Sequence, residues 1–254
     1  AGNMGEGIGM PFDTAGGGHN GEESGGQGSE EDATPEFGEL DPRRERMLTA
    51  SRLAEYVGLS PYVTPKLVWQ LYTGKVTDNR EDFAAARHGI RLEPIIRRMY
   101  ERMYGYTVQA AGYCIHPTIP FVGATPDGLV GEAGLVEIKA PVHNLYGRIP
   151  RQYMAQMQGQ MEVFGRSWCD FVCYCARTNQ ISVHSVSRSR EYWSWMQPLL
   201  FEFQSCVTED RCPTSLTWPP ETPPPRWCER GEPLVRPTHY RYPLSRCPPS
   251  LTTR

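Results

Sequence analysis

Apolar and polar residues follow two rhythms along the chain, and these rhythms predict where helices and strands lie. In residues 81–104, apolar side chains return every three or four positions, which is typical of one buried face of a helix. These apolar positions are Leu92, Ile96, Met99 and Met103. We expect Gly105 to end this helix and Pro94 to kink or restart it, because proline cannot donate the backbone hydrogen bond of a helix interior.

Three further segments have helical spacing, at residues 48–57, 65–72 and 153–164. In the last of them one side is apolar, and glutamines recur every four residues on another side. The apolar side holds Tyr153, Met157, Met161 and Phe164, and the glutamines are Gln152, Gln156 and Gln160. A glutamine stripe is ordinarily solvated, but burial of the apolar side turns Gln156 toward the strands that precede this helix.

Four short apolar runs are predicted as β-strands, at residues 121–124, 135–140, 169–175 and 180–186. Helices therefore come first, and strands with one helix among them follow. This order predicts a single α/β domain of about 165 residues, a size within the ordinary range for a domain.

The chain divides into three parts. Residues 1–41 contain twelve glycines and few large apolar groups, so they cannot bury enough surface to offset the entropy of ordering, and we expect them to be disordered. Residues 42–208 form the folded domain. We expect residues 209–254 to form an extended tail, because eleven of the 23 prolines lie from Cys212 onward and proline blocks regular structure.

The net charge of -3 conceals an uneven distribution. Residues 1–41 carry ten of the 29 acidic residues and none of the 26 lysines and arginines. Residues 42–254 therefore hold 26 basic against 19 acidic residues, a net charge of +7. The predicted domain is thus basic, and the overall negative charge does not argue against a nucleic-acid partner.

The lengths of the apolar runs and the spacing of the cysteines argue against a membrane protein, a structural zinc site and a disulfide-bonded secreted protein. No apolar run approaches the roughly 18 residues of a membrane span, so we expect no membrane association. The eight cysteines form no paired Cys-x-x-Cys motif, which argues against a structural zinc. A domain of this length buries its own core, and three cysteines lie in the apolar run 169–175, so we expect reduced thiols in an intracellular protein.

Residues 123–141 carry the side chains that indicate chemistry. Alternate residues of a strand share a face, so Glu137 and Lys139 project together while Val136 and Ile138 point into the core. A Gly-Glu-Ala-Gly turn precedes this strand and folds the segment into a hairpin. Asp127 then falls opposite Glu137 or Ile138, with Cβ atoms about 5 Å apart, so the two carboxylates converge.

Two converging carboxylates repel each other unless a cation lies between them, and Mg²⁺, which prefers oxygen ligands, suits that gap. The backbone carbonyl of Ile138 would complete the coordination. Lys139 would hold or activate a water and stabilise charge on a phosphate. The alternative is a charged hairpin whose acids pair with Lys139 at the surface, because Pro-Asp followed by Glu-x-Lys is a degenerate motif.

The long helix carries acidic and basic side chains that allow two interpretations. Glu93 is either a site residue or a surface acid paired with Arg97, its i+4 neighbour. Five arginines of this helix form either a solvated face or a ridge that binds DNA phosphates. They are Arg87, Arg91, Arg97, Arg98 and Arg102.

Four blocks of sequence occur in a fixed order and carry a family resemblance. They are His-Gly-Ile-Arg-Leu-Glu-Pro (88–94), Thr-Pro-Asp-Gly-Leu (125–129), Gly-Leu-Val-Glu-Ile-Lys-Ala-Pro (134–141) and Tyr-Met-Ala-Gln-Met-Gln (153–158). This succession resembles the phage lambda exonuclease or YqaJ-type viral recombinase family of the PD-(D/E)xK nuclease superfamily, which is related to herpesvirus alkaline nucleases. The resemblance covers approximately residues 44–177. It implies a restriction-endonuclease-like core, with a mixed central β-sheet flanked by helices.

The resemblance also implies roles for individual residues. Asp127 and Glu137 would bind Mg²⁺, with Mn²⁺ as a substitute, and Lys139 would be the catalytic lysine. Glu93 would reach the same site and its metal from the long helix, and Gln156 would orient the water or the metal shell.

The same resemblance extends to the start of the domain. Thr-Ala-Ser at residues 49–51 is similar to the family's entry to its first helix. Arg44 would then match the arginine that receives the 5′-phosphate of DNA, and Ser51 would be a nearby hydroxyl contact. Arg43 and Arg46 are alternatives to Arg44.

A Mg²⁺-dependent 5′-to-3′ exonuclease of double-stranded DNA is the activity that the family implies, in recombination, repair or viral genome processing. The family further implies a ring-shaped homotrimer and a single-strand-annealing protein as partner. An endonuclease on the same core and a non-catalytic DNA-binding recombination factor stay open as alternatives. We expect an intracellular location, in the host nucleus for a viral protein or the cytoplasm for a phage or bacterial one.

Overall fold

A computed structural model describes residues 47–77, 83–227 and 229–238. A six-stranded sheet has the order β2-β5-β6-β7-β8-β9, and a three-stranded sheet has the order β1-β4-β3. The strands are β1 (Leu48–Thr49), β2 (Val108–Gln109), β3 (Cys114–Ile115), β4 (Val122–Ala124), β5 (Gly128–Val130), β6 (Gly134–Lys139), β7 (Trp168–Cys175), β8 (Gln180–Ser187) and β9 (Leu234–Pro237). In the large sheet only β6 and β7 run parallel, so the sheet is mixed, as predicted.

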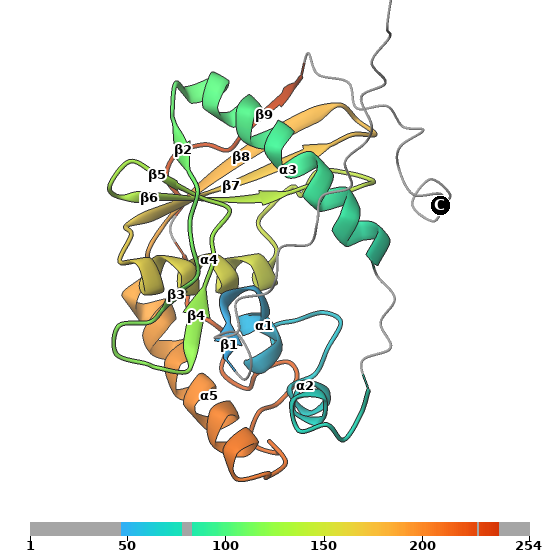
Figure 1. Ribbon diagram of the computed structural model, residues 1–254, viewed down its shortest axis with the longest axis vertical. Coiled ribbons are helices and arrows are strands. Elements are labelled where there is room, and N and C mark those ends of the chain that lie inside the picture. Colours follow the sequence, from blue (N-terminus) through green and yellow to red (C-terminus); the bar gives the residue numbers. More distant parts are fainter. Residues whose placement is uncertain (1–46, 78–82, 228, 239–254) are drawn as a thin grey trace, which may run out of the picture. The chain divides into compact units, whose positions relative to one another are not determined.

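Helices cover both faces of the large sheet (Figure 1). They are α1 (Leu53–Tyr56), α2 (Pro65–Tyr72), α3 (Phe83–Tyr104), α4 (Arg151–Phe164) and α5 (Arg190–Thr208), with a 3-10 turn, η2, at Ala50–Arg52. One core lies between α3 and the sheet, and a second lies between the sheet and α4, α1, α2 and α5. The α/β architecture with helices flanking a mixed sheet is therefore confirmed. None of the helices in the described ranges is long and apolar enough to cross a membrane.

Strand β6 divides its side chains between these two cores. Val136 and Ile138 pack with α3, while Leu135 packs on the side of α4. Glu137 shares the α4 side with Leu135, because alternate residues of a strand point to the same face. The predicted alternation is confirmed, and it directs Glu137 toward a helix rather than toward solvent.

Pro94 was expected to kink or restart helix α3, and the helix continues through Pro94 without a restart. Pro94 is exposed, and so is Ile90, whose carbonyl loses its helical partner. That carbonyl can therefore reach water, which lowers the cost of proline at this position. The predicted apolar stripe is confirmed, since Leu92 and Ile96 are fully buried.

The segment predicted as a helix at 48–57 begins as a strand. Leu48 and Thr49 pair in parallel with Val122 and Gly123 of β4. The chain then passes through η2 into the short helix α1. Pairing with a strand more than seventy residues away outweighs the local helical pattern.

Strands β4 and β5 are close in sequence but belong to different sheets. Strand β4 lies in the small sheet, and β5, only three residues later, forms the hairpin with β6. The strand predicted at residues 121–124 is confirmed as β4, but β5, not β4, pairs with β6 in the hairpin. The intervening Thr125, Pro126 and Asp127 carry the chain from one sheet to the other.

Residues after α5 contribute to the fold, although a tail without regular structure was expected. Strand β9 pairs with β8 and completes the sheet edge. Trp218 Nε1 donates a hydrogen bond of 2.7 Å to the carbonyl of Ser60, next to α1. Prolines removed donors from this segment, but enough donors remain for it to pack along the domain.

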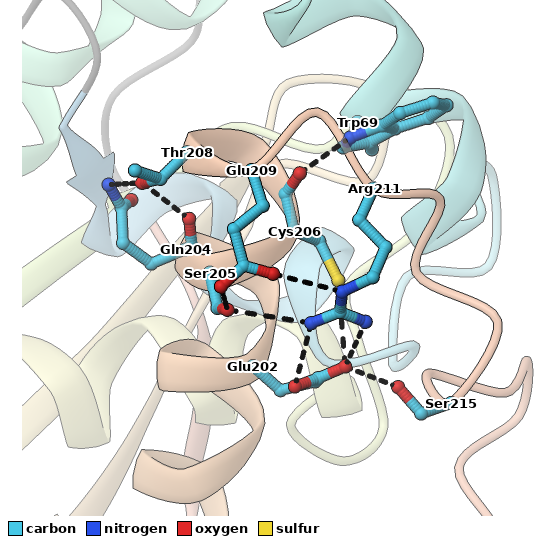
Figure 2. Close-up of polar contacts among 9 residues, drawn as sticks. All are labelled: Trp69, Glu202, Gln204, Ser205, Cys206, Thr208, Glu209, Arg211 and Ser215. Carbon is cyan, nitrogen blue, oxygen red and sulfur yellow. Dashed lines mark hydrogen bonds and ion pairs between the residues drawn. The ribbon is translucent and has the colours of Figure 1, made fainter.

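A polar network fastens the start of this segment to the end of α5 (Figure 2). Arg211 donates to Glu202 at 3.0 Å and to Glu209 at 3.1 Å, and Ser215 also donates to Glu202 at 2.7 Å. Trp69 of α2 donates to the carbonyl of Cys206 on α5 at 3.1 Å. The end of α5 therefore joins α2 to the following segment.

The first 41 residues and the cysteines were also the subject of predictions from the sequence. Residues 1–41, which were expected to be disordered, lie outside the described residues. The six described cysteines form no disulfide among themselves: Cys114, Cys169, Cys173, Cys175, Cys206 and Cys212.

Candidate active site

The β5–β6 hairpin fixes Asp127 relative to Glu137. Its register pairs Gly128 with Val136, so Asp127, directly before β5, comes opposite Glu137. Asp127 Oδ2 accepts a hydrogen bond of 2.6 Å from the backbone N–H of Ile138. The predicted position of Asp127, opposite Glu137 or Ile138, is confirmed.

The Glu137 carboxylate is buried, with 1% of the residue exposed, and three side chains serve it. Oε1 accepts a hydrogen bond of 2.7 Å from Gln156 Nε2 and forms an ion pair with Lys139. Oε2 accepts a hydrogen bond of 2.7 Å from Gln160 Nε2. These donors replace the water that burial removes, which a buried charge requires.

Lys139 forms the positive centre of this group. Its Nζ contacts Glu137 and lies 5.1 Å from the ring centre of Tyr153. Burial by itself would lower the pKa of Lys139, but the negative charges of Glu137 and Asp127 outweigh this effect and raise the pKa above its ordinary value. Lys139 is therefore held as an ammonium ion, suited to attract anionic oxygen atoms rather than to accept a proton.

The ionised form of Asp127 is destabilised by its surroundings. Burial raises its pKa well above the ordinary value, and repulsion from Glu137 and Glu93 raises it further. Lys139 and the N–H of Ile138 act in the opposite direction without cancelling the rise. A cation beside these carboxylates would relieve the repulsion.

Glu93 approaches from α3, on the other face of the sheet. Arg97 Nη2 donates to Glu93 Oε1 at 2.7 Å and to the backbone carbonyl of Asp127 at 2.8 Å. The i+4 pair of the alternative interpretation therefore exists, but the same arginine also ties α3 to the loop that carries Asp127. Arg97 is thus a site neighbour and does not belong to an exposed ridge. The other four arginines are exposed: Arg87, Arg91, Arg98 and Arg102.

A cavity of about 720 Å³ opens beside these groups. Glu93, Asp127 and Lys139 line it, together with residues 140–146 after β6 and Tyr153 of α4. The cavity offers space for a ligand next to two carboxylates and a fixed ammonium. This combination suits a phosphodiester accompanied by a divalent cation.

The donor set fits Mg²⁺. No group of three or more His, Cys, Asp or Glu side chains in the described part of the chain forms a ready-made metal cluster. Mg²⁺ does not need one, because it commonly takes one or two carboxylates, keeps several waters and binds substrate phosphate. Asp127 and Glu137 supply two carboxylates whose repulsion, seen in the raised pKa of Asp127, a divalent cation would offset.

Of the predicted 5′-phosphate contacts, Ser51 lies within the described residues. Arg44 and its alternatives Arg43 and Arg46 lie outside the described residues. Ser51 is exposed in the η2 turn, with its Oγ 3.4 Å from Thr49 Oγ1. The turn does pack against α4, the helix that carries Gln156.

Gln160 is the site neighbour that sequence reasoning missed. The glutamine stripe of α4 was expected to be solvated, and only Gln156 was assigned to the site. Both Gln156 and Gln160 are buried and bond to Glu137. A signal was available, because the glutamine side of the helix also carries the apolar Val163, three residues after Gln160.

The region of the chain that contains this site is similar to a known protein family and to individual proteins. The model of the YqaJ-like viral recombinase domain matches residues 40–167. The uncharacterized protein YqaJ of Bacillus subtilis (strain 168) is 30% identical over 129 residues, which are 48% of this chain and 40% of that protein. The chain therefore spans less than half the length of this curated relative.

The fold of this chain is also similar to that of solved structures. The alkaline exonuclease LHK-Exo from Laribacter hongkongensis is 32% identical, with a TM-score of 0.57, over 66% of this chain and 90% of that one. The structure of LHK-Exo in complex with dAMP gives a TM-score of 0.58 at the same identity and coverage.

Proposed function

The chain belongs to the family of YqaJ-like viral recombinase domains, and on that basis we propose that it is a Mg²⁺-dependent exonuclease that digests double-stranded DNA in the 5′-to-3′ direction. The observation that carries the proposal is the convergence of Asp127, Glu137 and Lys139 beside one cavity. Similarity to an alkaline exonuclease supports DNA as the substrate, and the dAMP complex of that enzyme supports a mononucleotide product.

Asp127 and Glu137 would hold Mg²⁺, with the Ile138 carbonyl and Glu93 as further oxygen ligands and Mn²⁺ as a substitute. When bound, the ion supplies Lewis-acid stabilisation of charge on the scissile phosphate. Ion binding and phosphate binding are then coupled at one place, since the same cavity wall carries Lys139.

Hydrolysis requires an oriented water and a stabilised phosphate. Lys139 attracts the phosphate oxygens and holds the water, and Gln156 orients the water beside Glu137. The water oxygen bonds to phosphorus as the bond from phosphorus to the 3′-oxygen breaks. One water proton passes to solvent, and the 3′-oxygen takes up a proton. The products are a 5′-mononucleotide and a strand with a new 5′-phosphate.

The 5′-to-3′ direction of digestion would be determined by recognition of the 5′ end of the DNA strand. In the proposal Arg44 receives the 5′-phosphate and Ser51 contributes a hydroxyl contact. Because each cleavage leaves a new 5′-phosphate, the product of one cycle presents the same end group to the next. Exposed arginines of α3 would contribute sequence-independent phosphate contacts, so affinity should fall steeply with salt.

The proposed setting is DNA recombination, repair or viral genome processing. A homotrimer would enclose the DNA, and a single-strand-annealing protein would take the strand that digestion exposes. The protein would act inside the cell, in the host nucleus for a viral protein or in the cytoplasm for a phage or bacterial one.

Digestion of linear duplex DNA, with and without a 5′-phosphate, tests the chemistry and the direction together. We expect Mg²⁺ to permit stepwise release of mononucleotides from the 5′ end and a chelator to stop it. Closed circular duplex serves as the matched substrate without ends and should stay intact. Cleavage of the circle would instead support an endonuclease, and binding without any cleavage would support a DNA-binding recombination factor.

A further inference from the structure

Helix α4 presents two glutamines to one carboxylate. Gln156 and Gln160 are four residues apart, so their side chains lie on the same face of the helix, one turn apart. Each donates a hydrogen bond of 2.7 Å, Gln156 to Oε1 of Glu137 and Gln160 to Oε2. The two amides therefore hold both oxygens of the same carboxylate.

This pair of bonds restricts the last torsion of the Glu137 side chain. Rotation of a carboxylate about its terminal carbon–carbon bond is normally broad, because the torsion has no sharp staggered wells. Donors on both oxygens fix the plane of the group. They thereby fix how the oxygen lone pairs of Glu137 are directed.

Among the described residues, Gln160 is the side chain that donates a hydrogen bond to Oε2 of Glu137. The residue is 0% exposed and Glu137 is 1% exposed, so solvent does not reach the bond. Lys139 and Gln156 both serve Oε1. Within the described ranges, the bond from Gln160 is the side-chain hydrogen bond of Oε2.

Packing alone does not explain an amide at this position. The other end of the Gln160 side chain, Oε1, is buried and has no hydrogen-bond partner among the described residues. A buried acceptor without a partner costs stability, so methionine, of similar length, would suit a purely structural role better. The Gln160 amide therefore lowers stability at its oxygen while its nitrogen bonds to a carboxylate of the site.

We infer that Gln160 is a positioning residue, which orients the Glu137 carboxylate for binding the divalent cation. This inference rests on the proposed function, and it extends the site by one residue. As a neutral donor, Gln160 fixes the carboxylate without cancelling its charge, so attraction for the cation is kept. Partners of this kind typically change metal affinity or activity about 10- to 100-fold when they are removed.

The test compares Gln160→Met with Gln158→Met. Gln158 is an equally buried glutamine of α4, but it bonds to the backbone of Ser187 and Ser189, away from Glu137. Affinity for Mn²⁺, the probe, is measured without DNA from the loss of the free-ion electron paramagnetic resonance signal. The kcat and KM for linear duplex are measured in parallel.

We expect Gln160→Met to weaken Mn²⁺ binding and to lower kcat, each about 10- to 100-fold, with little change in KM for DNA. Gln158→Met should lower thermal stability but leave Mn²⁺ affinity unchanged. Equal Mn²⁺ affinity in Gln160→Met and wild type, or equal losses in both variants, would overturn the inference. If the wild-type protein neither binds Mn²⁺ nor digests DNA, the proposed function itself fails.

A measurement on the wild-type protein covers the case in which Gln160→Met does not fold. The side-chain amide signals of the glutamines are followed by nitrogen-15 nuclear magnetic resonance during a Mg²⁺ titration. The signals of Gln156 and Gln160 should shift, and that of Gln158 should not. An unmoved Gln160 signal at saturating Mg²⁺ would contradict the inference.

Discussion

Asp127 and Ile138 are joined across the β5–β6 hairpin, where the Asp127 carboxylate accepts a hydrogen bond of 2.6 Å from the backbone N–H of Ile138. The donor belongs to the backbone, so no second side chain is needed to hold the carboxylate in place. The amide oxygen of an asparagine can accept the same bond. Substitution by asparagine therefore separates the charge of Asp127 from its position.

Asp127→Asn should abolish most of the nuclease activity. The variant keeps the bond to Ile138 but offers a weaker, neutral ligand to Mg²⁺, so transition-state charge on the phosphate loses its stabilisation. We expect kcat to fall about 1,000-fold or more, since Lewis-acid stabilisation is worth several kcal/mol. Nucleotide release from linear duplex in saturating Mg²⁺ measures the effect, and full activity would refute the assignment of Asp127.

The same Asp127→Asn change should stabilise the metal-free fold. Burial and Glu137 raise the pKa of Asp127, which means that the folded state penalises its ionised form at neutral pH. Removing that charge should raise the melting temperature in chelator by a few degrees. Added Mg²⁺ should then raise the melting temperature of the wild type and leave the variant unchanged. A lower melting temperature for the variant in chelator would contradict the electrostatic account.

Lys139→Ala should lower kcat by roughly 100- to 1,000-fold, the range found when one preorganised donor to a developing anion is lost. The ammonium contacts Glu137 at the cavity wall, so its loss affects the phosphate and the water together. Lys75→Ala is the matched control, because Lys75 forms an exposed ion pair with Asp210 elsewhere on the domain. Loss of activity in both variants would indicate a general effect of charge.

Acid should weaken the network at the end of α5. Hydrogen bonds from Arg211 and Ser215 lower the pKa of Glu202 to about 2. A carboxylate whose folded pKa is depressed stabilises the fold above its unfolded pKa, about 4.3, and loses this contribution as the pH falls toward 2. Wild type should therefore be more stable than Glu202→Gln at pH 7, and the two should converge near pH 2. Urea unfolding across this range provides the measurement.

Glu221→Gln is the control for the Glu202 experiment. It removes an exposed carboxylate outside the network of Figure 2. The change leaves the bonds of Arg211 and Ser215 to Glu202 intact, so it should not reproduce the loss of stability expected for Glu202→Gln at pH 7. A constant difference in stability between wild type and Glu202→Gln from pH 7 to pH 2 would contradict the lowered pKa of Glu202.

Two glycine substitutions in helices should have opposite effects. A Cβ at Gly159 of α4 would come within 2.2 Å of Leu53 Cδ1 in α1, whereas a Cβ at Gly89 of α3 would have nothing within 4 Å. We expect Gly159→Ala to destabilise the fold by about 1–3 kcal/mol through overpacking. Gly89→Ala should stabilise it by up to about 1 kcal/mol through helix propensity. Denaturant unfolding measures both, and equal signs would contradict the packing described at Gly159.

Much of the site could be predicted from sequence because its parts are local. Asp127 and Glu137 belong to one hairpin, and strand alternation alone places Glu137 and Lys139 on one face. The turn at residues 131–134 determines the register, which brings Asp127 opposite Glu137. Helix α2 likewise has the predicted bounds, since Pro65 and the Thr64 cap are local signals.

Other features depend on contacts between segments far apart in sequence. Leu48 and Thr49 are helical in pattern yet pair with β4, and β4 itself joins a sheet different from that of β5. The proline-rich segment after α5 contributes β9, because strand β8 has an open edge that accepts it. Local propensity is weak beside such pairing, which satisfies many backbone groups at once.

The sequence by itself determined which side chains carry charge at the hairpin and that they share one face, because strand period and turn position are encoded in neighbouring residues. Only the tertiary structure decided what surrounds them. Gln160 became a partner of Glu137, and Arg97 a partner of Asp127, when α4 and α3 packed against the sheet. Burial removes water from such groups and obliges them to bond to whatever the packing brings near, which no local pattern specifies.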